Sequence, residues 1–188
     1  MGVRLIALVA LAAATLGACG GGGPAPAPAV VHGCEVSVES AWTAGGQSYR
    51  VTAATTGAVC GDAEAVLTVA DAAGQVLLRD VFPTADVMTL LLAEEPAAME
   101  AALRAWIDQP GYNLAASARL PAWGAGADTP MAGGYPFYPE AAFERDAYEA
   151  LRGRNAPLFC YVQGLESIAC HAFENGVFAK VGVQVIPG

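Results

Sequence analysis

A single dipeptide, Asn175-Gly176, most constrains how this chain can fold. Both residues tolerate the positive φ of a type I′ turn. The dipeptide lies between Phe173 and Val177 in an apolar stretch. A two-residue hairpin centred there sets the strand register and places Cys170 opposite Val181. The C-terminal part of the chain is therefore predicted to form an antiparallel sheet.

The first nineteen residues have the features of an export signal. A cationic start with Arg4 leads into an apolar run, Leu5 to Leu16, and the sequence Leu-Gly-Ala-Cys ends at Cys19. The run is shorter than the roughly twenty residues that a helix needs to cross a ~30 Å hydrocarbon core. This segment resembles the signal peptide and lipobox of bacterial lipoproteins, and the resemblance covers only this front part of the chain.

The resemblance implies that residues 1–18 are removed and that Cys19 is acylated with fatty acids such as palmitate. Two or three acyl chains hold a protein on a bilayer where one does not. In this family Asp after the lipidated cysteine retains the protein at the inner membrane, so Gly20 implies the outer membrane, and we expect the domain to face the periplasm. The alternative is a plain secreted protein cleaved near Ala12-Ala13-Ala14.

The rest of the chain divides into a tether and one domain. Residues 19–33 hold the lipidated cysteine and a Gly/Pro/Ala tether with His32, and residues 34–188 are expected to form a single globular domain. Without the signal and its Arg4 the chain has 8 basic and 18 acidic residues, a formal net charge of −10. This charge disfavours nucleic acid and anionic lipid headgroups as partners. The remaining partners are the membrane, through the anchor, and an envelope protein.

The four remaining cysteines of an exported chain indicate two disulfides. We favour Cys34–Cys60 and Cys160–Cys170, because each pair falls within one local unit of strands. A metal site is the competing interpretation, but there is no Cys-x-x-Cys and the chain has only two histidines. We expect neither a metal nor a cofactor.

Alternation of apolar and polar residues predicts an α+β fold with two antiparallel meanders, one early and one late in the chain. Two or three helices are expected between them: a short one capped by Thr84, one beginning at Pro96, and one over 140–152 that ends at Gly153. A weak edge strand is expected over 112–120.

Two groups of residues are candidate binding sites. On the late meander the register lines up Phe159, His171 and Lys180, with Tyr161 beside them, on a face that is either covered by a helix or free for a partner. The second group comes from the Gly- and Pro-rich stretch 121–139, whose aromatic residues either attach the loop to the domain or bind a ligand. These are Trp123, Tyr135, Phe137 and Tyr138.

No catalytic residue is predicted, because no phosphate loop, dinucleotide fingerprint, calcium loop, zinc spacing or nucleophile elbow occurs. We therefore favour a non-catalytic binding or structural role in the envelope over an enzyme. One alternative is an inhibitor of a cationic hydrolase such as lysozyme, which an acidic surface suits. The other is a carboxylate-based hydrolase of cell-wall or sugar substrates, which uses acidic residues within 108–140.

Overall fold

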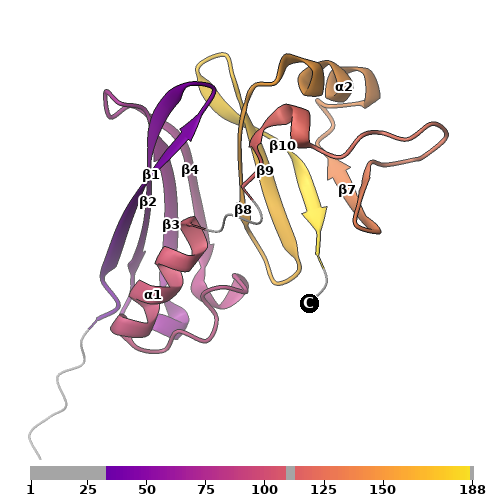
Figure 1. The fold of residues 1–188 in the computed structure, drawn as a ribbon. Helices are drawn as coiled ribbons and strands as arrows, with labels where there is room; N and C mark the ends of the chain where they lie inside the picture. Colours follow the sequence, from indigo (N-terminus) through magenta and orange to yellow (C-terminus); the bar gives the residue numbers. More distant parts are fainter. Residues whose placement is uncertain (1–32, 109–112, 187–188) are drawn as a thin grey trace, which may run out of the picture. The chain divides into compact units, whose positions relative to one another are not determined.

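The computed structural model describes residues 33–108 and 113–186, all within one compact unit, Val31–Gly188 (Figure 1). The expected signal peptide, Cys19 and the tether through His32 lie outside the described residues. So does Tyr112, at the start of the expected edge strand. Among the described residues, no helix is long and apolar enough to span a bilayer.

The early meander forms the first sheet, with strand order β1-β2-β3-β4 and every pair antiparallel. Buried residues alternate along β1, β2 and most of β3, as predicted, whereas β4 buries the consecutive Leu77 and Leu78. The Asp71 carboxylate closes the β3–β4 hairpin by accepting the backbone N–H groups of Ala73 and Gln75 at 2.9 Å each. The strands are β1 Val36–Ala44, β2 Gln47–Thr56, β3 Glu64–Ala70 and β4 Val76–Pro83.

The late meander forms the middle of a larger second sheet with order β5-β8-β9-β10-β7-β6. The chain's predicted hairpins account for β8, β9 and β10. The strands β6 and β7 join the sheet at β10, from a stretch whose sequence predicted only a loop. The strands are β5 Ala115–Ala116, β6 Met131–Ala132, β7 Tyr135–Pro139, β8 Pro157–Val162, β9 Ser167–Glu174 and β10 Val177–Val185.

The predicted register of β9 and β10 is correct up to the pair His171 and Lys180 and wrong beyond it. A β-bulge follows Lys180, so that Gly182, not Val181, lies opposite Cys170. The bulge adds one residue to β10 and brings Gly182 against β7, where it pairs with Pro139. Beyond the bulge, β10 therefore pairs with β9 on one side and with β7 on the other.

The structure contains two α-helices, α1 Pro96–Ile107 and α2 Arg145–Arg154. Helix α1 begins at Pro96 as predicted and buries Met99, Leu103 and Trp106. The prediction of a helix capped by Thr84 is wrong, since only a short 3-10 turn, Thr84–Asp86, forms there. The Thr84 hydroxyl caps nothing and instead donates a hydrogen bond of 2.7 Å to the buried Cys60 carbonyl.

Two further boundaries differ from the predicted ones. Helix α2 runs past Gly153 and ends where Asn155 takes the left-handed conformation with φ of 54°. The expected edge strand over 112–120 is reduced to β5, because the chain turns at once into a 3-10 helix, Ser117–Arg119. Alanine-rich sequence gives an edge strand little side-chain packing to hold it.

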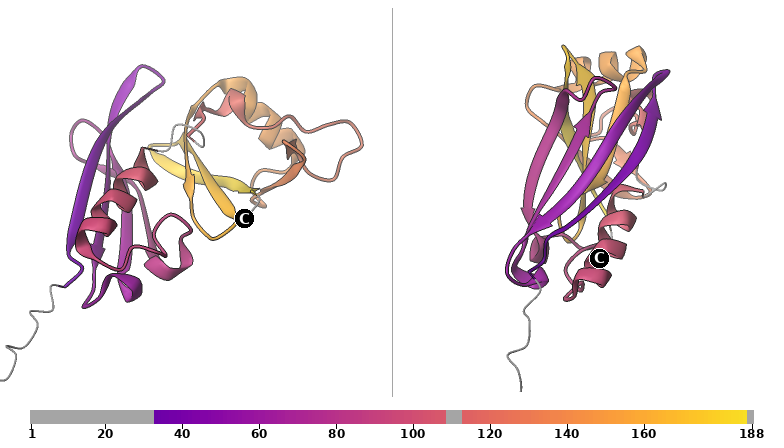
Figure 2. Two further views of the ribbon diagram at one scale, coloured as in Figure 1. Left: turned by 60° about the horizontal axis from the view of Figure 1, so that its bottom comes forward. Right: turned by 90° about the vertical axis from the view of Figure 1, so that its left-hand side faces the viewer.

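The two sheets are separate layers whose facing sides share aromatic residues (Figure 2). Trp42 of β1 lies 5.1 Å, centroid to centroid, from Phe159 of β8, and Phe82 of β4 lies 6.1 Å from Tyr161. Trp106 of α1 contacts the rings of Phe82 and Tyr161 edge-on. The main core thus lies between the first sheet, α1 and one face of the second sheet.

Both predicted disulfides are confirmed. Cys34 is bonded to Cys60, with Cα atoms 4.8 Å apart, and Cys160 to Cys170 across the β8–β9 pair, with Cα atoms 4.1 Å apart. The first ties the start of the first sheet to the 3-10 turn Cys60–Asp62. The second lies on the face of the second sheet that points away from the first sheet.

Candidate functional site

A pocket of about 330 Å³ opens on that outer face of the second sheet. Its floor is formed by β9 and β10, one wall by the β6–β7 hairpin, and the other by the chain around residues 114–121. Most of the lining is apolar, and the size is at the small end of ordinary ligand pockets. The lining residues are Leu114, Arg119, Pro121, Met131, Ala132, Tyr135, Phe137, Ile168, Cys170, Gln184, Val185 and Ile186.

The β6–β7 wall is held in place by backbone and amide contacts. Gly133 and Gly134 both have positive φ, as a type I′ hairpin turn requires. The Gln184 side chain of β10 donates to the carbonyl oxygens of Tyr135 and Pro136, at 3.2 and 3.1 Å. Phe137 of β7 is 1% exposed and belongs to the core, and it also lines the pocket. The wall is therefore part of the folded sheet.

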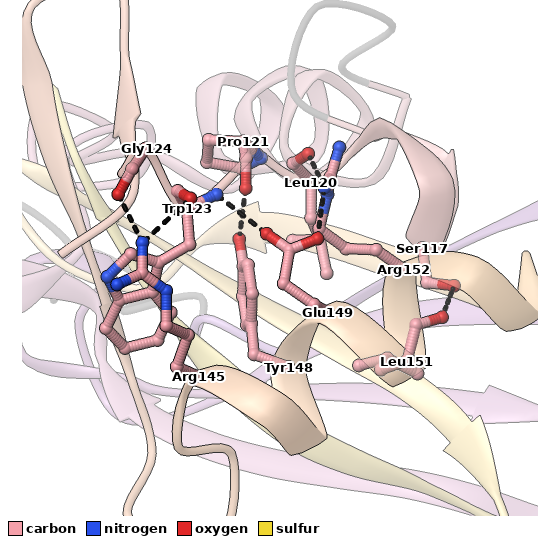
Figure 3. A network of polar contacts seen from close by, with 10 residues as sticks. All are labelled: Ser117, Leu120, Pro121, Trp123, Gly124, Arg145, Tyr148, Glu149, Leu151 and Arg152. Atoms are coloured by element: carbon pink, nitrogen blue, oxygen red, sulfur yellow. Dashed lines mark hydrogen bonds and ion pairs between the residues drawn. The ribbon is translucent and has the colours of Figure 1, made fainter. Parts of the chain in front are cut away.

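The opposite wall is attached to α2 by hydrogen bonds to backbone carbonyls (Figure 3). Tyr148 donates to the Pro121 carbonyl at 2.8 Å, and Arg152 Nε donates to that of Leu120 at 2.9 Å. Ser117 donates to the Leu151 carbonyl at 2.7 Å. The first two bonds satisfy carbonyls of a segment that has little secondary structure of its own, and the third joins its Ser117 hydroxyl to the helix.

Trp123 belongs to the same attachment and not to the pocket. Its backbone N–H donates to Glu149 at 2.7 Å, and its ring lies under the Arg145 guanidinium, 5.6 Å from the centroid. Burial by itself raises the pKa of Glu149, but the hydrogen bonds from Trp123 and Arg152 outweigh it and hold this pKa below its usual range. Trp123 thus attaches the loop to the domain.

No protein-family model matches the chain, and no curated protein or solved structure matches it significantly.

The structure divides the four aromatic candidates of the loop. Tyr135 and Phe137 line the pocket, whereas Trp123 and Tyr138 do not. Tyr138 is exposed on the outside of the hairpin. The other lining residues were not predicted as site residues. One of them, Arg119, stands out in the sequence, because it is the sole basic residue between Arg104 and Arg145.

The predicted patch on the late meander is not a surface. Phe159, Tyr161 and His171 are all at most 5% exposed. The first sheet covers much of this face, because Trp42 of β1 packs on Phe159 and Phe82 of β4 packs on Tyr161. Trp106 of α1 also contacts Tyr161. Lys180 alone reaches solvent, where its ammonium pairs with Glu140 at 3.3 Å. Of the two alternatives for this face, the free patch is therefore wrong for Phe159, Tyr161 and His171, and the face is covered.

Three polar side chains meet in this buried layer. Tyr161 donates a hydrogen bond to the Asp80 carboxylate, and His171 Nε2 lies 3.5 Å from both groups. Burial is the main cause that lowers the pKa of His171, and Lys180 adds to it, against the opposing effects of Asp80, the Phe178 backbone and Glu140. Burial together with Asp80 raises the pKa of Tyr161. His171 is therefore neutral at pH 7 and is a buried residue of the core.

We expect this histidine to make the domain less stable as the pH falls below about 6.5, the ordinary pKa of an unfolded histidine. In that range the unfolded chain takes up a proton that the native state does not, so acid favours unfolding. Urea unfolding between pH 7.5 and 5.0 measures the effect, with H171F as the test variant and H32N in the tether as the control. The H171F protein should lose less stability over this range than the H32N protein, and equal losses would contradict the assignment.

Within the described ranges, no group of three or more histidine, cysteine, aspartate or glutamate side chains is arranged to hold a metal ion.

Proposed function

We propose that this chain is a lipid-anchored envelope protein that binds a small, largely apolar molecule non-catalytically in the pocket of the second sheet. The observation that carries the binding role is the pocket itself, preformed between anchored walls and lined mainly by apolar side chains. The anchor rests on the resemblance of the segment ending at Cys19 to a lipoprotein signal. The outer membrane follows from Gly20, by the same resemblance.

The chemistry of the lining supports binding over catalysis. No carboxylate or histidine lines the pocket, and the one cysteine in it, Cys170, is held in a disulfide. Tyr135 supplies a hydroxyl, but no base among the lining residues stands beside it to activate it. The lining therefore offers a ligand apolar contacts but no activated nucleophile or catalytic base.

The alternative of a carboxylate-based hydrolase uses acidic residues within 108–140, and one of these, Asp108, lines a second hollow without another carboxylate beside it. A third hollow is lined by Glu39 and Asp71, which lie outside that range. Glu39 is paired with Arg50 at 3.7 Å, and Asp71 accepts two backbone N–H groups of its own hairpin. Neither hollow therefore contains two carboxylates without partners, which this reaction would use as its two catalytic groups.

Filling the pocket is expected to weaken the binding of an uncharged apolar probe at least tenfold. Ala132 is exposed at the pocket wall, so A132W adds a large ring there without disturbing the core. The matched control is A125W, an exposed position of the same loop outside the lining. The measurement is the fluorescence of N-phenyl-1-naphthylamine, titrated into the full chain carrying C19S, which takes no acyl group.

The A132W protein should bind the probe at least tenfold more weakly than the A125W protein. Because both proteins keep the N-terminal apolar run, the difference between them reports on the pocket. Thermal unfolding checks that both variants are folded. Equal probe affinity in the two folded variants would refute the pocket as the binding site.

A further inference from the structure

Arg119 brings an unpaired positive charge to the pocket. The structure describes eight basic residues, of which five make ion pairs and Arg145 donates to two carbonyls. Arg79 and Arg119 are the two described cations for which neither an ion pair nor a hydrogen bond to another residue is found. Only Arg119 lines a pocket, and it is exposed.

The backbone on either side of Arg119 is fixed. Ser117, two residues before it, donates to the Leu151 carbonyl and accepts the Ala156 N–H at 2.8 Å. Leu120, directly after it, is buried, and its carbonyl accepts from Arg152 (Figure 3). The Arg119 side chain thus starts from an anchored position and keeps all its donors free.

The charge around Arg119 contrasts with that of the whole chain. The full sequence has a formal net charge of −9, yet no acidic residue is among those that line the pocket. An unpaired guanidinium beside an apolar cavity attracts an anion whose remaining part is apolar. Guanidinium also binds carboxylate and phosphate groups with two parallel hydrogen bonds.

Resting on the pocket-binding function above, we propose that the ligand is a small amphiphile with one anionic group, of which a medium-chain alkanoate is the simplest case. Its apolar chain lies against Ile168, Phe137 and Val185, and its anionic group pairs with the Arg119 guanidinium at the mouth. A carboxylate and a phosphate monoester share this chemistry, so the experiment includes both.

The test is displacement of N-phenyl-1-naphthylamine from the full C19S chain by four ten-carbon compounds below their micelle concentrations. They are decanoate, decyl phosphate, decanol and decyltrimethylammonium. Each is measured on the parent chain, on R119A and on R79A, the matched control, which removes the other unpaired arginine from the first sheet. Arg119 is exposed, so its replacement should leave the fold intact, and thermal unfolding verifies this.

We expect decanoate or decyl phosphate to bind about tenfold more weakly to R119A than to the parent and R79A proteins, which corresponds to about 1.4 kcal/mol. Decanol should bind all three equally, and the anion's affinity should fall as salt is added. Stronger binding of decanoate than of decyl phosphate would indicate a carboxylate ligand, and the reverse would indicate a phosphate ligand. Either result supports the proposal. Equal binding of decanol and both anions, or a preference for decyltrimethylammonium, would overturn it.

Failure of the pocket itself looks different in this experiment. If none of the four compounds displaces the probe, or the probe does not bind, the proposed function is wrong as well. If decanol displaces the probe but R119A changes nothing for the anions, the pocket stands and only the anionic ligand is refuted.

Discussion

Replacing Gly182 by alanine is expected to destabilise the domain by about 3 kcal/mol and to abolish binding in the pocket. A Cβ atom built at this position lies 2.6 Å from Phe137 Cε1 and 2.8 Å from Pro139 Cα, and closer still to the Tyr138 carbonyl oxygen. Two of these three contacts are with backbone, which cannot turn aside as a flexible side chain does. To admit the methyl group, β7 must move away from β10.

The loss of binding follows from the same movement. Strand β7 carries Tyr135 and Phe137, which line the pocket. Gln184 of β10 donates to the carbonyls of Tyr135 and Pro136 in this strand. Urea unfolding measures the stability and titration of the apolar probe measures the pocket. The matched control is G153A in α2, where no atom lies within 4 Å of the added Cβ.

The control should be neutral or slightly more stable, because alanine is the better helix former by about 1 kcal/mol. A G182A protein as stable as the parent would show that β7 does not press on the bulge of β10. A destabilised G182A protein that still binds the probe with parental affinity would show that the pocket does not depend on β7.

Replacing Trp106 by alanine is expected to cost about 3–5 kcal/mol of unfolding free energy. The ring is 1% exposed and meets Phe82 of the first sheet and Tyr161 of the second, each 6.1 Å from it between centroids. Its Nε1–H donates to the Val162 carbonyl at 2.6 Å. The substitution therefore opens a cavity among α1 and both sheets and leaves a buried carbonyl without its donor.

Urea unfolding of three variants separates these contributions. W106F keeps most of the packing and loses the hydrogen bond, so its cost should fall between zero and that of W106A. L92A truncates a large apolar side chain that is 84% exposed, and it should change stability by no more than about 0.5 kcal/mol. A W106A cost near that of L92A would mean that α1 does not connect the two sheets through this ring.

The strands of the two meanders and both disulfides were predictable because their signals are local. Asn175-Gly176 needs only its own backbone preferences to form a hairpin, and its neighbours in β9 and β10 pair in the expected register up to Lys180. Cysteines within one unit of strands are brought together as soon as those strands pair, and both expected bonds are present. Pro96 likewise marks the start of α1 through its own geometry.

The β6–β7 hairpin had a local signal that was overlooked. Gly133-Gly134 lies between Ala132 and Tyr135 and has the positive φ values of a type I′ turn, just as Asn175-Gly176 has. The surrounding prolines and glycines indicated a loop, because proline is rare inside sheets. In the structure Pro136 and Pro139 lie in β7, a strand of 5 residues between β10 and the short edge strand β6.

The burial of Phe159, Tyr161 and His171 and the pocket on the opposite face were decided by tertiary structure alone. Alternation along β8 and β9 predicts correctly that these residues share a face, but it contains nothing about which element covers that face. The first sheet covers it, from residues about a hundred positions away in the chain.

The sequence by itself therefore determined the two antiparallel meanders, both disulfides and helix α1, because each depends on backbone preferences or on residues close together in the chain. Only the tertiary structure decided that the second sheet extends to β6 and β7, that its aromatic face is core, and that Arg119 lies beside an apolar pocket. Those features arise where segments distant in sequence pack together, and the free energy of such packing depends on shape and burial in three dimensions.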